Sequence, residues 1–179
     1  MEIILIFPGQ RTIKRPTNKE RTAIMKGNTK VIERLNARLA DELTAINQYM
    51  VHSEMCANWG YAKLHAVIEK RAINEMKHAE KLIGRILFLE GRPVVSILNK
   101  ISIGAKVEDQ HARDWQAEND AVKAYNDDIR FAAESGDNGT RDMLTDILKD
   151  EEDHINWIEE QLDQIAQLGV QNYLVEQMH

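Results

Sequence analysis

The chain is poor in the residues that interrupt or cross-link secondary structure. Its 179 residues contain one cysteine, three prolines and nine glycines. The single cysteine, Cys56, excludes an intrachain disulfide and every zinc or iron–sulfur motif built from paired cysteines. No run approaches the roughly 18 apolar residues of a membrane span, so the sequence predicts none. Long stretches without glycine or proline favour long helices.

Positive charge is also in short supply. The chain has 23 basic and 29 acidic residues, which gives a formal net charge of −6. A nucleic-acid-binding protein normally shows the opposite sign or a basic stripe, and the sequence has neither. No nucleic-acid partner is therefore expected. Hydrophobic residues make up 43% of the chain and charged residues 29%, which is typical of a folded domain.

The first 24 residues differ in character from the rest. An apolar run at 3–7 is followed by Pro8, Gly9 and a basic polar stretch up to Arg21. The run lacks the preceding basic region and the small-residue cleavage site of a signal peptide, which favours a cytoplasmic protein. Two interpretations of residues 1–24 stay open: a native extension, or upstream sequence ahead of a start at Met25. The functional domain is expected over residues 25–179.

Glycines divide the remaining chain at regular intervals. Helices are expected from residue 28 or 29 to 60, from 62 to 90, from 107 to 134 and from 138–140 to 169, with a short helix within 170–178. The first and second helices are tightly joined, as are the third and fourth, so each pair must be antiparallel. The link over 92–106 is long enough to run the length of a bundle. The predicted fold is all-α: a four-helix bundle with one long crossover and a short C-terminal helix.

A carboxylate interrupts the apolar stripe of each long helix near its middle, at Glu42, Glu75, Glu118 and Glu151. Glu42 lies 18 residues before Gly60, and Glu75 lies 15 residues after it. Glu118 and Glu151 stand at the same two separations from Gly136. The four carboxylates should therefore meet at one height in the bundle.

Two histidines, His78 and His154, follow Glu75 and Glu151 by one helical turn on the same face. Buried carboxylates are costly unless they are paired or bound to metal. Four carboxylates and two imidazoles are a charge-compatible ligand set for two divalent irons. The alternative is a buried salt-bridge network that uses Arg71, but one cation cannot neutralise four carboxylates.

The Glu-x-x-His spacing also occurs at Glu108/His111 and at Glu176/His179. Glu108 lies about 15 Å along its helix from Glu118, and Glu176 belongs to the C-terminal tail. Both additional pairs are interpreted as solvated coincidences.

A second apolar set lies off the predicted core on the first two helices. It comprises Leu43, Met50, Ile73, Met76 and Ile83. Met76 directly follows Glu75 and should point about 100° away from it. An isolated chain would expose this set to water, which indicates a partner surface. Spacing alone favours subunit packing over haem ligation by Met76.

Several segments together resemble one family. They are MKGNTKVIERLN (25–36), ADELTAINQYMVH (40–52), NEMKHAEKLIGRILFLEGRP (74–93), RDMLTDILKDEEDHINWIEEQLDQI (141–165) and GVQNYLVEQ (169–177). The arrangement resembles the ferritin-like di-iron carboxylate proteins and, within them, the bacterioferritin family. The resemblance implies a cage of 24 subunits built from dimers, which would store iron, and a ferroxidase centre inside each bundle.

The resemblance also implies which residues would bind iron and haem. The iron pair, two Fe per subunit, would be held by Glu42, Glu75, His78, Glu118, Glu151 and His154. Met76 from each of two subunits would ligate one haem, b-type or a related iron porphyrin, per two subunits. Other family members place an extra histidine and aspartate where this chain has Lys70 and Asn74, which are poor iron ligands.

The implied reaction is oxidation of Fe(II) by O2 or H2O2, with haem assisting iron release and a small ferredoxin- or rubredoxin-type protein as candidate electron donor. Three alternative functions would use the same bundle differently. In a haem electron carrier the six metal-type ligands would have no use. A di-iron peroxidase of the rubrerythrin kind usually carries a cysteine-ligated segment, which Cys56 alone cannot build. A purely structural cage would not need inward carboxylates.

Overall fold

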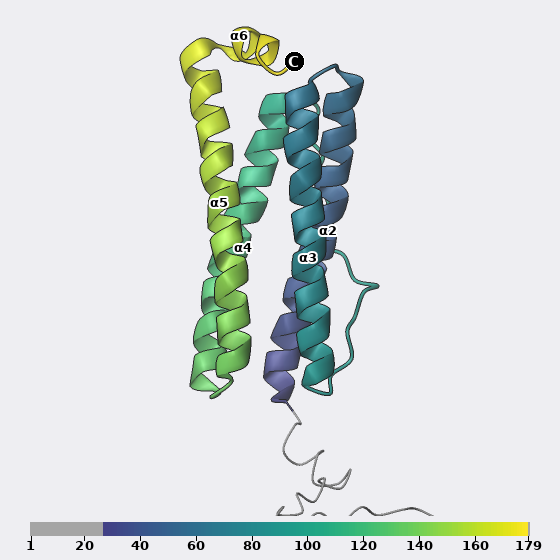
Figure 1. The fold of residues 1–179 in the computed structure, drawn as a ribbon, viewed down its shortest axis with the longest axis vertical. Coiled ribbons are helices and arrows are strands. Elements are labelled where there is room, and N and C mark those ends of the chain that lie inside the picture. Colours follow the sequence, from purple (N-terminus) through teal and green to yellow (C-terminus); the bar gives the residue numbers. More distant parts are fainter. Residues whose placement is uncertain (1–26, 179) are drawn as a thin grey trace, which may run out of the picture.

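The long helices begin and end close to the predicted positions. The computed structural model describes residues 27–178, so the interpretations of residues 1–24, Met25 and His179 lie outside the described residues. The helices are α2 (Thr29–Asn58), α3 (Ala62–Phe88), α4 (Val107–Glu134), α5 (Asn138–Leu168) and the short α6 (Val170–Val175). They form the predicted four-helix bundle, with α6 across one end (Figure 1). Within residues 27–178, none of the helices is both long and apolar enough for a membrane span.

Two glycines close the helical hairpins. Gly60 and Gly136 have φ angles of +85° and +73°, a region that side chains with a Cβ rarely adopt. The predicted end of the second helix at Glu90 was slightly wrong, because α3 ends at Phe88. Glu90 adopts a left-handed φ of +61°, and the Gly91 amide then donates to the Ile86 carbonyl at 2.8 Å. This early exit from the helix lets Leu89 pack into the core.

The crossover over 92–106 runs along α2 and is hydrogen-bonded to side chains of that helix. Asn36, Thr44, Gln48 and His52 accept hydrogen bonds from four crossover amides at 2.7–3.0 Å. Because successive members of this set are four or eight residues apart, they follow a shallow spiral along the helix surface. The crossover thus satisfies its backbone donors while it runs along the bundle.

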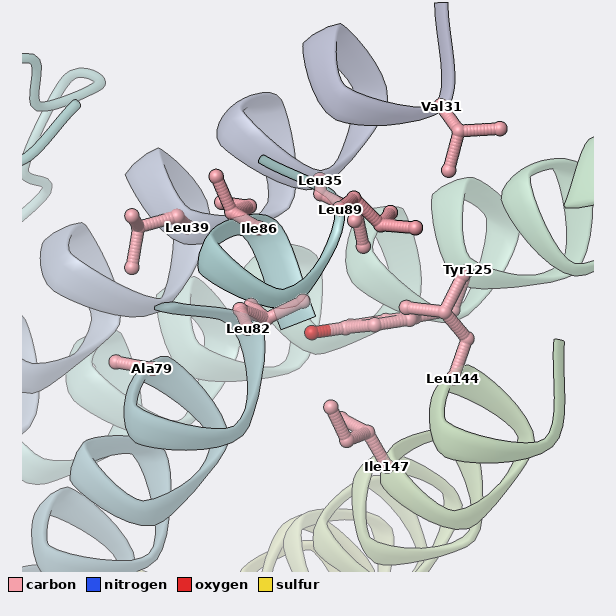
Figure 2. Close-up of a cluster of buried hydrophobic side chains, with 10 residues drawn as sticks. All are labelled: Val31, Leu35, Leu39, Ala79, Leu82, Ile86, Leu89, Tyr125, Leu144 and Ile147. Carbon is pink, nitrogen blue, oxygen red and sulfur yellow. The ribbon is translucent and has the colours of Figure 1, made fainter. Parts of the chain in front are cut away.

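Two apolar clusters fill the two halves of the bundle. The cluster drawn in Figure 2 lies toward the Gly136 turn and comprises Val31, Leu35, Leu39, Ala79, Leu82, Ile86, Leu89, Tyr125, Leu144 and Ile147. The other lies toward the Gly60 turn and comprises Tyr49, Cys56, Leu64, Ile68, Ala72, Val107 and Tyr173. On every long helix, the central glutamate lies between residues that pack into the two clusters. The carboxylates therefore form a polar layer between two apolar ones.

Candidate metal centre

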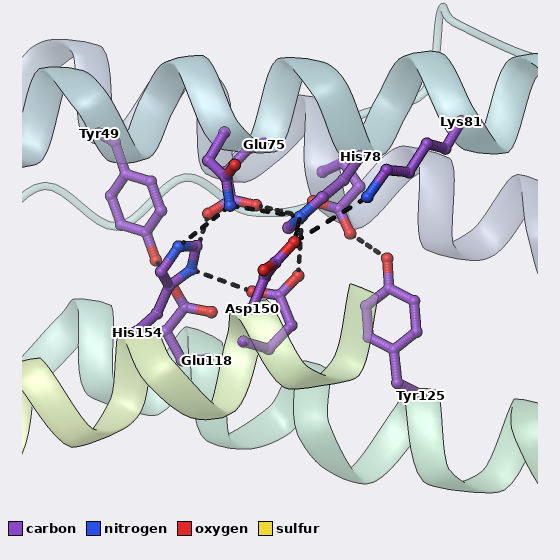
Figure 3. A network of polar contacts seen from close by, with 11 residues as sticks. Tyr49, Glu75, His78, Lys81, Glu118, Tyr125, Asp150 and His154 are labelled. Carbon is purple, nitrogen blue, oxygen red and sulfur yellow. Dashed lines mark hydrogen bonds and ion pairs between the residues drawn. The ribbon is translucent and has the colours of Figure 1, made fainter. Parts of the chain in front are cut away.

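The ligand atoms of the four central glutamates come together inside the bundle. Figure 3 labels two of these residues, Glu75 and Glu118. The relative exposures of the four glutamates are only 1–3%. His78 is fully buried, and His154 is largely buried beside it. Their ligand atoms fall into two overlapping groups, and within each group all atoms lie within 4.8 Å of one another. One group is Glu42, Glu75, His78 and Glu151, and the other is Glu75, Glu118, Glu151 and His154.

Glu75 and Glu151 each divide their two oxygens between the two groups. Glu75 Oε2 lies 2.9 Å from His78 Nδ1, whereas Glu75 Oε1 lies 3.1 Å from His154 Nδ1. Glu151 Oε1 and Oε2 lie 3.2 Å from the same two nitrogens, one each. Glu42 approaches only His78, and Glu118 only His154, at 3.7 and 3.3 Å. The donor set can thus hold two cations with two shared and two unshared carboxylates.

The histidines and three of the glutamates in this layer have strongly shifted pKa values in the metal-free protein. Burial opposes charge on both histidines, yet hydrogen bonds to three carboxylates each raise the pKa of His154 to about 11 and that of His78 well above its usual value. Burial also works against the Glu75 anion, but both imidazoles outweigh it and lower its pKa to about 2. Burial raises the pKa of Glu118 to about 8 and that of Glu42 well above its usual value.

Two tyrosine hydroxyls hold the outer carboxylates. Tyr49 donates a short hydrogen bond to Glu118 Oε1, and Tyr125 donates one to Glu42 Oε1. Both phenols are buried, and burial followed by the neighbouring carboxylate raises their pKa values well above 10. Each tyrosine therefore remains a hydrogen-bond donor. Sequence reasoning placed Tyr125 only in the apolar stripe of its helix and missed this role.

The Nε2 atoms of the histidines have partners on the opposite side. Asp150 Oδ2 lies 3.0 Å from His78 Nε2, which fixes the ring with Nδ1 toward the carboxylates. The side-chain nitrogen of Asn74 lies 3.3 Å from His78 Nε2 and 3.4 Å from His154 Nε2. Asp150 was not singled out from the sequence, because a residue adjacent to Glu151 is expected to point about 100° away from it.

Of the other Glu-x-x-His pairs, Glu108/His111 lies away from this layer, and its interpretation as solvated was wrong. His111 is buried rather than solvated, and its Nε2 lies 3.2 Å from the Tyr173 hydroxyl. Burial lowers the pKa of His111 to about 4, so it is neutral. Its ring packs edge-on against Trp157. Glu176 is exposed, as expected.

Arg71, the cation on which the salt-bridge alternative was based, does not pair with this layer. Within residues 27–178, Arg71 makes no ion pair with any of the four carboxylates, and its guanidinium instead lies over the rings of Tyr49 and Trp157. The two histidines are the cations that face the carboxylates.

Cavities adjoin the layer on two sides. One, of about 380 Å³, lies between α2 and α4 and is lined by all four glutamates. The other, of about 350 Å³, lies between α3 and α5 and reaches His154. Small ions and molecules can therefore approach the centre from either side.

Comparison with known proteins gives a uniform picture. Residues 32–168 match the model of the ferritin family, described as a ferritin-like domain. The bacterioferritins of Rhodobacter capsulatus and Brucella melitensis are 41% and 40% identical over 149 residues, 83% of this chain and 92% of each relative. The bacterial ferritin of a Synechocystis strain is 39% identical over 155 residues, 86% of this chain and 99% of the relative. With its four-helix bundle, this chain belongs to the ferritin family and resembles the bacterioferritins within it.

Proposed function

We propose that this chain stores iron and oxidises Fe(II) to Fe(III) at the polar layer of its bundle. The observation that carries the proposal is the division of the Glu75 and Glu151 oxygens between two ligand groups. A carboxylate shared in this way holds two cations close together. The relationship to bacterioferritins supports iron as the cation.

Each residue of the layer has a distinct task in this proposal. Glu42 and His78 would bind one Fe(II), Glu118 and His154 the other, and Glu75 and Glu151 both. The two ferrous ions supply the electrons that reduce O2 or H2O2. Tyr49 and Tyr125 keep the outer carboxylates in position, and Asp150 orients His78. Glu75 Oε1 is buried and lies 3.1 Å from His154 Nδ1, so a metal that displaces the imidazole proton would meet both ligand atoms in place.

Metal binding to the iron-free protein is expected to release protons. Because the pKa of His154 is about 11 and that of His78 is raised well above its usual value, both imidazoles carry protons at pH 7 that a metal must displace. Loading two ions should therefore release at least about two protons, and the apparent affinity should rise with pH. Glu118, whose pKa is about 8, adds a further proton at pH 7 that is already lost at pH 9.

This linkage can be measured with Zn2+, which has no redox chemistry, in a weakly buffered pH-stat titration. The His78→Ala/His154→Ala protein serves as the comparison and should release fewer protons per bound ion. Binding of Zn2+ to the unmodified protein without proton release would contradict the assigned protonation of the layer.

Assembly into a cage of 24 chains is the second part of the proposal. Met50, Ile73 and Met76 are each about half exposed on α2 and α3, as expected for a surface that a second copy covers. The particle should have a mass of about 494 kDa, 24 times the 20.6 kDa of one chain. Sedimentation or native mass spectrometry tests this directly, and a uniform monomer or simple dimer would contradict it.

A chain that begins at Met25 should assemble equally well, because the domain is proposed to occupy residues 25–179.

The haem expected from the family would lie on this same surface. Met76 is 54% exposed, it points away from the metal layer, and its thioether has no polar partner within residues 27–178. An exposed thioether within an apolar surface fits an axial ligand from each of two copies, and therefore one haem per two chains. Such a haem would carry electrons toward stored ferric iron.

A further inference from the structure

Arg71 is a buried cation that the proposed function does not use. Its residue is 5% exposed, and its Nη1 atom is buried with no hydrogen-bond partner in the described part of the chain. Within residues 27–178 it makes no ion pair, and its guanidinium carbon lies over the faces of Tyr49 and Trp157, 5.5 and 4.8 Å from the ring centroids. A buried guanidinium normally binds a carboxylate or phosphate through paired hydrogen bonds. Arg71 therefore lacks the anion that its burial calls for.

The cavity between α3 and α5 has room for that anion. Arg71 lines it together with Lys70 and Lys77, two lysines of the same helix, α3. Neither lysine is within ion-pair distance of a carboxylate in the described part of the chain. Since residues 70, 74 and 77 are spaced by four and three, they share one face of the helix. Three cations without carboxylate partners in the described part of the chain thus line one cavity.

The acidic residues at this cavity cancel only part of that charge. Asp150 faces His78 Nε2 at 3.0 Å and Lys81 at 3.9 Å, so its carboxylate is already occupied. Asp153 also lines the cavity, and its single negative charge offsets only one of the three positive charges of Lys70, Arg71 and Lys77. The uncompensated charge in the cavity is therefore positive.

We propose that this cavity is a binding site for inorganic phosphate. The Arg71 guanidinium would provide the buried, bidentate contact, and the two lysines would bind the outer oxygens. The bound anion would lie beside His154, on the side of the layer away from the carboxylate-lined cavity. Phosphate binding at this cavity does not depend on the proposed function.

Binding is tested on the metal-free full chain by isothermal titration with sodium phosphate at constant ionic strength. One saturable site per chain is expected. Arg71→Gln should weaken binding by at least about tenfold, because a charge-assisted contact is lost from a buried position. The matched control is Lys149→Gln, which removes a charge from an exposed lysine on α5 that pairs with Asp146, and should leave the affinity unchanged. Absence of a saturable site, or equal binding by Arg71→Gln and the unmodified protein, would overturn the proposal.

Two further measurements make the assignment specific. Lys70→Gln/Lys77→Gln changes only exposed side chains, so the fold should persist and phosphate binding should still weaken severalfold. Unchanged affinity in this variant would also overturn the site. Adenosine monophosphate distinguishes free phosphate from a phosphoryl group on a larger molecule, and it is expected to bind more weakly than phosphate. Tighter binding of the nucleotide would overturn the assignment to inorganic phosphate. Because no iron is present, none of these outcomes depends on ferroxidase activity.

Discussion

The Glu75→Ala/His78→Ala protein is expected to lose rapid oxidation of Fe(II). Glu75 gives one oxygen to each ligand group, so its removal takes a ligand from both proposed iron positions at once. Loss of His78 removes the only imidazole from one of them. The initial rate of ferric formation in air, followed by stopped-flow absorbance, should fall by more than about a hundredfold, since loss of even an outer-shell partner of a metal ligand costs 10–100-fold.

The fold should survive this double change. The double change removes the Glu75 carboxylate together with the His78 imidazole that partly neutralises it. The apolar clusters on either side of the layer remain intact. Glu80→Ala, at an exposed glutamate of the same helix, controls for the loss of a carboxylate from α3. Both proteins should keep the helical circular-dichroism signal. Oxidation by the double variant at the unmodified rate would mean that the chemistry occurs elsewhere.

Much of this arrangement could be predicted from the sequence because it depends on distances along single helices. Gly60 and Gly136 fix where the hairpins turn, and equal separations from them set the height of each glutamate. Helical periodicity then gives the inward face and places each histidine one turn beyond its glutamate. The convergence of residues from four helices therefore follows from local rules together with antiparallel pairing.

Tyr125 and Asp150, whose roles at the layer the sequence did not predict, make contacts between different helices. Tyr125 reaches Glu42 from α4, and Asp150 reaches His78 from α5, so both contacts depend on how one helix is rotated against another. Spacing within one helix carries no information about that rotation. His111 was misjudged for the same reason, because Tyr173 of α6 covers it and supplies a hydrogen-bond partner. A polar residue can thus be buried outside the metal layer wherever a neighbouring helix provides a partner.

The Met76→Leu protein is expected to assemble without haem. Leucine keeps the apolar volume of this surface but lacks the sulfur that would bind haem iron from each of two chains. The absorption spectrum of the purified protein should lose its haem bands, while Fe(II) oxidation persists because Met76 points away from the metal layer. Reductive release of stored iron should slow.

Met76→His should instead retain haem, with a shifted spectrum and a lower potential, because imidazole stabilises ferric iron better than a thioether does.

Met50→Leu provides the matched control for Met76→Leu. Met50 is an exposed methionine on α2, about as accessible as Met76, so the control makes the same chemical change at a comparable surface position. It should keep one haem per two chains. If Met76→Leu also retained that ratio, Met76 would not be an axial ligand, since leucine offers no atom that can bind iron. The metal layer would be unaffected by that outcome, because its six ligands are held by contacts in which Met76 takes no part.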